Sequence, residues 1–144
     1  MALIFSDPVG AGPFISYGMK DVCVKAFKLT NANFATGNVD AQLGVFPADV
    51  SILGFDVWVK TVLSGNGVTL PVVSLGTASG GAQFTSAVAV TNSAGYSAKL
   101  TPVTGILQPH DNINRTDVPL WLRGGCSTGT PTAGELYLVV YYVR

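Results

Sequence analysis

The sequence predicts an all-β domain, an antiparallel β-sandwich or jelly roll of about eight strands, with almost no helix and an irregular N-terminal arm. Glycine and proline interrupt the chain at short intervals, with 17 Gly and 8 Pro among 144 residues. The runs between them are short and rich in β-branched and aromatic residues, which is typical of strands. The longest stretch free of both, residues 19–36, lacks the i, i+3, i+4 apolar stripe of an amphipathic helix.

Short strand candidates account for half of the chain from residue 21 onward. Residues 39–45 alternate apolar and polar side chains, as in a half-buried strand, whereas residues 135–143 are apolar on both faces. A strand of the second kind is expected at the centre of a sheet with both of its sides covered. We expect strands at residues 21–27, 39–45, 50–60, 68–75, 82–90, 97–101, 118–123 and 135–143.

Turn and bulge signals separate these strands. Residues 46–49 are expected to form a turn. Gly54 falls inside an otherwise regular strand, which indicates a bulge or a sharp bend. Residues 64–67, Ser-Gly-Asn-Gly, predict a hairpin-type turn because Asn and Gly tolerate positive φ. Pro71 has no N–H to donate, so it indicates an edge or bulged position in its strand.

Residues 1–18 do not fit the strand pattern and are interpreted as an N-terminal arm, whereas residues 19–144 form a single β-sandwich domain. The chain length is close to the usual size of one domain. The arm combines chain-breaking residues with large apolar side chains, a composition suited to lying over a neighbouring surface. The alternative is a first strand or loop folded onto its own core. The large apolar residues of the arm are Leu3, Ile4, Phe5, Phe14, Ile15 and Tyr17.

Charge is scarce and balanced. The chain is 48% hydrophobic and 11% charged, with eight basic and eight acidic residues, whereas ordinary domains carry about 25% charged residues. This composition favours association with partners over a monomer coated in Ser, Thr, Asn and Gly. It argues against nucleic acid, because phosphate binding needs a basic face. Lys20, Lys25 and Lys28 form only a loose group, which we interpret as a solvated strand face.

The sequence shows no membrane or export signal. The apolar run after Met1 is too short for a signal-peptide core, and no run approaches the ~18 apolar residues of a membrane helix. Cys23 and Cys126 are far apart in sequence, and without an export signal we expect both to be thiols in a reducing compartment. We therefore expect no membrane partner.

Residues that carry catalysis or bind metal are sparse. His110 is the single histidine, it stands beside Asp111, and we expect it to be an exposed loop residue. No serine stands in a nucleophile-elbow pattern, and one His with two distant Cys does not give the ligand spacing of a zinc site. The oxygen-rich residues 111–117 lack the spacing of a known calcium loop, so a polar turn is the favoured interpretation over a calcium site. The sequence predicts no enzyme, no cofactor and no metal site.

The two tryptophans are the remaining functional candidates. Trp58 shares its strand face with Asp56 and Lys60, and Trp121 lies on the face of Arg123. A tryptophan on a polar face serves as an interface anchor, as a sugar platform or as packing against a second layer, and packing is slightly favoured. The candidate interface residues are Leu3, Ile4, Phe5, Phe14, Ile15, Tyr17, Trp58 and Trp121.

Three segments, in their order, resemble small bacteriophage virion proteins. Residues 39–54 contain a strand, a "leucine-glycine, x, x, proline" turn and an apolar strand entering a glycine. Residues 74–77 read Ser-Leu-Gly-Thr, a strand end found in the middle of such proteins. Residues 132–134 read Thr-Ala-Gly and precede an aromatic-rich terminal strand. The likeness covers about residues 39 to 143, and the first 38 residues take no part in it.

This resemblance implies a β-sandwich virion protein and carries over no catalytic residue. It points to a capsid decoration (cement) protein that binds and stabilises the assembled head. The expected partners are the major capsid protein or other virion proteins, with a homo-oligomer, a trimer or a dimer. The implied location is the virion, after synthesis in the host bacterial cytoplasm. The alternative is a tail or fibre module that binds a host-surface carbohydrate or another virion protein.

Overall fold

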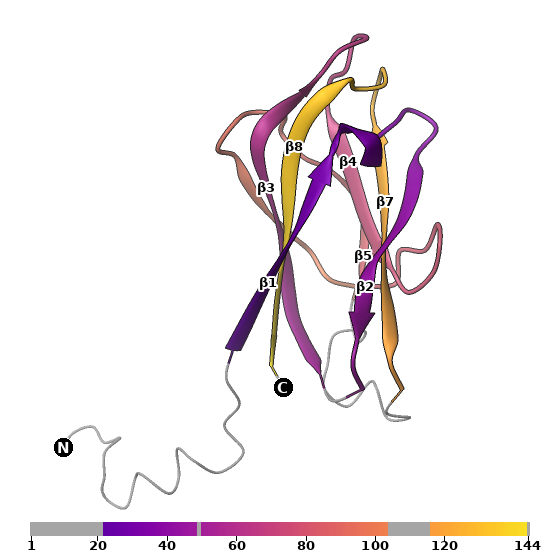
Figure 1. The fold of residues 1–144 in the computed structure, drawn as a ribbon, viewed down its shortest axis with the longest axis vertical. Coiled ribbons are helices and arrows are strands. Elements are labelled where there is room, and N and C mark those ends of the chain that lie inside the picture. Colours follow the sequence, from indigo (N-terminus) through magenta and orange to yellow (C-terminus); the bar gives the residue numbers. More distant parts are fainter. Residues whose placement is uncertain (1–21, 49, 104–115, 144) are drawn as a thin grey trace, which may run out of the picture.

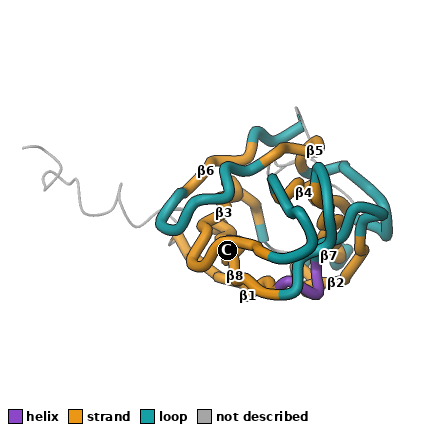
Figure 2. The backbone as a smooth tube through the Cα atoms, turned by 90° about the horizontal axis from the view of Figure 1, so that it is seen from above, coloured by secondary structure: helices purple, strands orange, loops and turns teal. Residues whose placement is uncertain are grey.

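A computed structural model describes residues 22–48, 50–103 and 116–143 of this chain. Two four-stranded antiparallel sheets lie face to face (Figures 1 and 2), which confirms the expected all-β sandwich of eight strands. The described residues also contain one short 3₁₀ helix, η1 (Asn31–Asn33). The strands are β1 (Val22–Thr30), β2 (Val39–Phe46), β3 (Ser51–Ser64), β4 (Pro71–Gly76), β5 (Thr85–Ala89), β6 (Ser97–Leu100), β7 (Val118–Cys126) and β8 (Ala133–Val143).

The strand pairing is nested. The first sheet has the order β1-β8-β3-β6 and the second sheet has the order β2-β7-β4-β5. The first strand therefore pairs with the last, β2 pairs with β7, β3 with β6 and β4 with β5. Of these pairs, only β4 and β5 follow one another in the chain. Most connections consequently cross from one sheet to the other.

One of these crossings corrects the hairpin expected at residues 64–67. The turn itself is present, with positive φ at Gly65, Asn66 and Gly67, and the Val68 N–H donates to the Gly65 carbonyl at 3.1 Å. It joins β3 of the first sheet to β4 of the second, so the two strands are not hydrogen-bonded neighbours. Turn residues specify the reversal of the chain, whereas the choice of partner strand depends on long-range packing.

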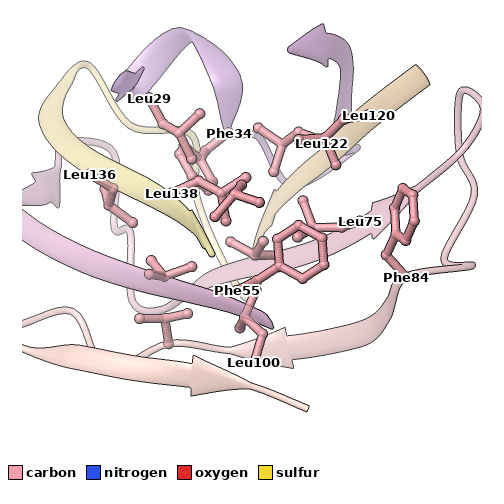
Figure 3. Packing of buried hydrophobic residues seen from close by; sticks show 14 of the residues in the cluster. Leu29, Phe34, Phe55, Leu75, Phe84, Leu100, Leu120, Leu122, Leu136 and Leu138 are labelled. Carbon is pink, nitrogen blue, oxygen red and sulfur yellow. The ribbon is translucent and has the colours of Figure 1, made fainter. Parts of the chain in front are cut away.

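The core lies between the sheets. Strand β3 sends Phe55, Val57 and Val59 inward, and all three are fully buried. Figure 3 shows how large apolar side chains from both sheets meet there. The labelled members are Leu29, Phe34, Phe55, Leu75, Phe84, Leu100, Leu120, Leu122, Leu136 and Leu138. Alternation along each strand produces this layer, because successive side chains point to opposite faces.

Strand β8 is central, as expected, because β1 and β3 flank it. The expectation that both of its faces are covered was wrong for the described residues. Leu136, Leu138 and Val140 are fully buried between the sheets, whereas Tyr137 and Val139 on the opposite face are only half-buried. A two-layer sandwich covers one face of each sheet, so the second apolar face of β8 lies on the outside.

Bulges account for two further outcomes. The register of β3 against β8 shifts between Ile52 and Gly54, which confirms the bulge expected at Gly54. A second shift, between Gln42 and Gly44 in β2, was not foreseen. An extra residue reverses the faces of the side chains that follow it. Val45 is therefore 51% exposed, contrary to the simple alternation expected for residues 39–45.

Pro71 is not at a sheet edge, because β4 pairs with both β5 and β7. It is the first residue of its strand, a position where the missing N–H is tolerated. Its carbonyl still accepts a hydrogen bond from the Val90 N–H at 2.8 Å. The expected edge or bulged position was therefore wrong, because the register shift of β4 falls later, between Val73 and Leu75. The start of the strand is what accommodates this proline.

Candidate functional site

Trp58 lies on the outer face of the first sheet and is 40% exposed. Strand β3 pairs Trp58 with Tyr137 of β8. The two rings stack with centroids 5.6 Å apart and planes 28° from parallel. Cross-strand aromatic pairs of this kind stabilise a sheet by about 0.2–1 kcal/mol. Trp58 therefore packs on its own sheet and still presents part of its ring to solvent.

A group of charged side chains adjoins this aromatic pair. The Glu135 carboxylate contacts Lys28 Nζ at 2.5 Å and Lys60 Nζ at 2.8 Å. Hydrogen bonds from Lys28 and Lys60 hold the pKa of Glu135 below its ordinary value. Two ammonium groups around one carboxylate leave a net positive charge at this end of the outer face.

The other end of the outer face is apolar. Val22 and Val24 of β1 are 63% and 57% exposed, and Leu53 of β3 is 50% exposed. Val24 is directly opposite Tyr141 of β8, and Val139 is the next residue on the same face of that strand. We call Val22, Val24, Leu53, Val139 and Tyr141 the apolar patch.

A shallow hollow of about 290 Å³ opens within the apolar patch. Val22, Leu53 and Tyr141 line it on the apolar side. Asp56 and Lys99, which are paired across β3 and β6, line it on the polar side. A hydrogen bond to Asp56 and the negative charge of that carboxylate raise the pKa of Tyr141. Polar groups therefore border the apolar patch on its β6 side.

Trp121 lies on the outer face of the second sheet, on the opposite side of the sandwich from Trp58. Leu120 and Leu122, its neighbours in β7, are buried in the core, whereas Trp121 is half-buried. The structure therefore does not bring the two tryptophans together. An interface that uses one of them does not include the other within the same subunit.

An ion pair organises the outer face around Trp121. Arg123 donates to Asp40 through Nε at 2.8 Å and through Nη2 at 3.2 Å, and Ser79 Oγ donates to the same carboxylate at 2.9 Å. The hydrogen bond from Arg123, followed by that from Ser79, lowers the pKa of Asp40. This contact ties the glycine-rich turn between β4 and β5 to β2 and β7, so its role is structural.

A second hollow, of about 270 Å³, lies between the two sheets near the start of β1. Phe27, Phe46, Leu120 and Tyr142 contribute to its mostly apolar wall, and Lys25 is the charged residue beside it. Lys25 Nζ lies 5.5 Å from the centre of the Phe27 ring. Lys25 and Lys28 therefore lie on opposite faces of β1, which corrects the expectation that they share a strand face.

The remaining expected residues divide between described and undescribed parts of the chain. The six apolar arm residues, His110, Asp111 and Lys20 lie outside the described residues. Asp117 is described, and its side chain accepts a hydrogen bond from the Ala48 N–H at 3.1 Å. Cys23 and Cys126 lie in different sheets and are not bonded to each other.

Two absences concern only the part of the chain that the structure describes. Residues 22–48, 50–103 and 116–143 contain no group of three or more His, Cys, Asp or Glu side chains that could hold a metal ion. Within the same ranges, no helix has both the length and the apolar character needed to cross a membrane.

The apolar patch and the charged group around Glu135 were not found from the sequence. Lys28 and Glu135 are 107 positions apart, and only the register of β1 against β8 brings them together. The apolar patch had only a weak signal in the sequence, namely the two valines at positions 22 and 24. Without the register, that spacing does not distinguish the outer face of β1 from its inner face.

Comparison with known proteins supports the fold. No family model and no curated protein matches the sequence. A chain described as "Capsid of Ralstonia phage GP4" shares the fold with a TM-score of 0.54 and 19% identity, over 88% of this chain and 85% of that one. A chain of "Cyanophage Pam1 capsid asymmetric unit" aligns with a TM-score of 0.47 and 16% identity, over 86% and 85% of the two chains.

Proposed function

We propose that this chain is a structural protein of a bacteriophage virion, and that it is a capsid decoration (cement) protein of the assembled head. The observation that carries the proposal is the fold shared with the Ralstonia phage GP4 capsid chain over most of both chains. The nested strand order β1-β8-β3-β6 and β2-β7-β4-β5 is compatible with a two-sheet jelly roll, an arrangement that viral capsid and lectin domains use, and so supports the proposal. The resemblance of residues 39–143 to small virion proteins supports the same role.

The surface of the described residues suits a protein that acts by contact. A decoration protein bridges neighbouring capsid subunits, so its binding free energy comes from buried area and from added contacts. The apolar patch is exposed surface of the kind that contacts between protein chains cover. Because the protein binds the assembled shell and not the free subunits, mass action stabilises the shell.

The proposal includes the partners and the location. The partners are the major capsid protein or other virion proteins, and the chain forms a homo-oligomer, a trimer or a dimer. It is made in the host bacterial cytoplasm and incorporated into the virion. It acts as a structural protein and not as an enzyme. Residues 1–18 contribute to the contacts that hold this chain in the shell.

Binding to isolated heads tests this proposal. Heads that lack the protein are mixed with the purified chain, sedimented and analysed by electrophoresis. We expect saturable occupancy, an upward shift in the temperature at which the shell opens, and reduced occupancy after deletion of residues 1–18. No binding to heads, or binding without a change in shell stability, would contradict a decoration role. Undiminished occupancy after the deletion would refute only the role of the arm and would leave the decoration role standing.

A second candidate function rests on Trp58. This ring is 40% exposed and stacked on Tyr137, and Lys60 Nζ lies 5.9 Å from the centre of the Tyr137 ring. An exposed tryptophan stacked on a half-buried tyrosine beside a cation is suited to stacking against a sugar, as in a tail or fibre module that binds a host-surface carbohydrate. A glycan array with the wild type and Trp58→Ala tests this function. Trp121→Ala on the opposite face is the matched control.

A further inference from the structure

The outer face of the first sheet departs from the usual pattern of a solvated sheet. An antiparallel sheet with one face in water places polar side chains on that face. Here β1 instead presents Val22 and Val24, at 63% and 57% exposed, and β3 presents Leu53 at 50%. Isolated exposed apolar residues are ordinary, but these three adjoin Val139 and Tyr141 in one apolar patch.

The patch also has the anatomy of an interface. Protein interfaces have an apolar centre and a polar, solvent-accessible rim. Asp56 and Lys99 border the patch on the side of β6. Lys28, Lys60 and Glu135 are farther along the same face. An occupant of this patch therefore needs large apolar side chains and little charge.

We propose that the apolar patch binds residues 3–17 of a second copy of this chain. That segment contains two groups of large apolar side chains, Leu3 to Phe5 and Phe14 to Tyr17, and its single charged residue is Asp7. Its composition therefore matches the apolar centre of the patch. The inference rests on the proposed homo-oligomer and names the contact that forms it.

The position of Val22 favours exchange between two copies. Val22 is both the first described residue after the segment and a member of the patch. To cover its own patch, the chain would have to reverse direction within residues 18–21. Two copies related by a twofold axis near their patches can instead exchange segments reciprocally, because one symmetry operation closes both contacts.

Self-association of the purified full-length protein tests the inference without any virion present. Sedimentation over a range of concentrations compares the wild type with a variant lacking residues 1–18 and with the double variant Val24→Ser/Leu53→Ser. Val45→Ser is the matched control, because Val45 is 51% exposed but lies on β2 of the second sheet. Far-UV circular dichroism and the thermal midpoint check that each variant folds.

We expect the wild type and Val45→Ser to form the same oligomer, and both other variants to associate at least tenfold more weakly. Amide exchange in residues 22–26 and 135–143 is expected to be slower in the oligomer than in the deletion variant, and this protection is expected to fall on dilution. A monomeric wild type, equal association after the deletion, or equal weakening by Val45→Ser would overturn the inference. Protection that persists in a diluted sample that sediments as a monomer would also overturn it, because the segment would then cover its own patch.

These outcomes are distinguishable from a failure of the proposed function. If the deletion variant still forms the wild-type oligomer, the contact named here is wrong and the homo-oligomer stands. Binding to isolated heads is a separate measurement, so a monomer that still decorates heads would contradict the homo-oligomer and the contact between copies, and would leave the decoration role standing.

Discussion

The side chain of Asn92 takes the place of a strand partner for Leu63. Leu63 donates its N–H to Asn92 Oδ1 at 2.8 Å, and Asn92 Nδ2 donates to the Leu63 carbonyl at 2.7 Å. Leu63 lies where the register of β3 against β8 shifts, between Thr61 and Ser64, so the ladder is interrupted there. One amide side chain therefore satisfies both backbone groups of a residue that is 2% exposed.

Replacing Asn92 with Ala is expected to destabilise the fold by about 1–3 kcal/mol, because both backbone groups of Leu63 lose their partner. Urea unfolding measures this change. Asn92→Asp keeps an acceptor for the Leu63 N–H but turns a carboxylate oxygen toward the Leu63 carbonyl, so it should not restore the stability of the wild type. Equal stability of wild type and Asn92→Ala would show that water replaces the side chain.

Gly124→Ala is expected to destabilise the protein by about 1–3 kcal/mol through overpacking. A Cβ at this position would overlap the carbonyl oxygen of Asn33 in η1, which passes directly over β7. Gly37→Ala is the control, because an added Cβ there meets no atom within 4 Å. Thermal melts of the two variants provide the comparison, and equal midpoints would contradict the close approach of η1 to β7.

Leu138→Ala and Val139→Ala separate the two faces of the central strand. Leu138 is fully buried, so its truncation is expected to cost about 2–5 kcal/mol. Val139 lies on the half-buried outer face, and its truncation should cost clearly less. Both free energies of unfolding come from denaturant titration of the deletion variant lacking residues 1–18, so that no arm contributes. Equal losses would mean that another part of the chain covers the outer face.

The charged group of Lys28, Lys60 and Glu135 predicts that the free energy of unfolding falls at both extremes of pH. The folded pKa of Glu135 is lowered by Lys28 and Lys60, so its contribution is present above the ordinary glutamate value of about 4.3 and is lost as pH falls through the lowered pKa. The pKa values of both lysines are raised by Glu135, so their contribution is present below about pH 10.4 and is lost as pH rises through the raised values.

Unfolding of Glu135→Gln across the pH range tests this dependence. The substitution should flatten both the acid and the alkaline limb of the stability profile. Asp40→Asn should flatten only the acid limb, because its partner Arg123 keeps its charge throughout. Both effects should shrink at high salt, since the groups are close to solvent. An unchanged alkaline limb in Glu135→Gln would contradict the lysine contacts.

Local sequence signals predicted the strands because alternation and chain breakers act within a few residues. Gly54 marked a real bulge, and residues 135–143 formed the central strand. The strand expected at residues 118–123 continues to Cys126, because Gly124 and Gly125 give room to η1 and the residues that follow it. The space is required by η1, a segment about 90 positions earlier in the chain, and local sequence patterns do not reveal such a distant contact.

The candidate site was predictable only in part, for the same reason. The sequence placed Trp58 on the face of Asp56 and Lys60, and the structure confirms this placement. The partnership of Trp58 with Tyr137, and of Lys28 with Glu135, depends on the register between distant strands. The apolar patch depends on which of two nearly equivalent faces of β1 turns toward the core, and packing against the second sheet decides that.

The most direct test of the account is to locate this chain in a reconstruction of the intact virion. The account predicts eight-stranded density on the outer surface of the head, contacting more than one capsid subunit at each position. It also predicts that a neighbouring chain covers the apolar patch on the outer face of the first sheet. Density confined to the tail, or absence of the chain from the particle, would contradict the proposed role.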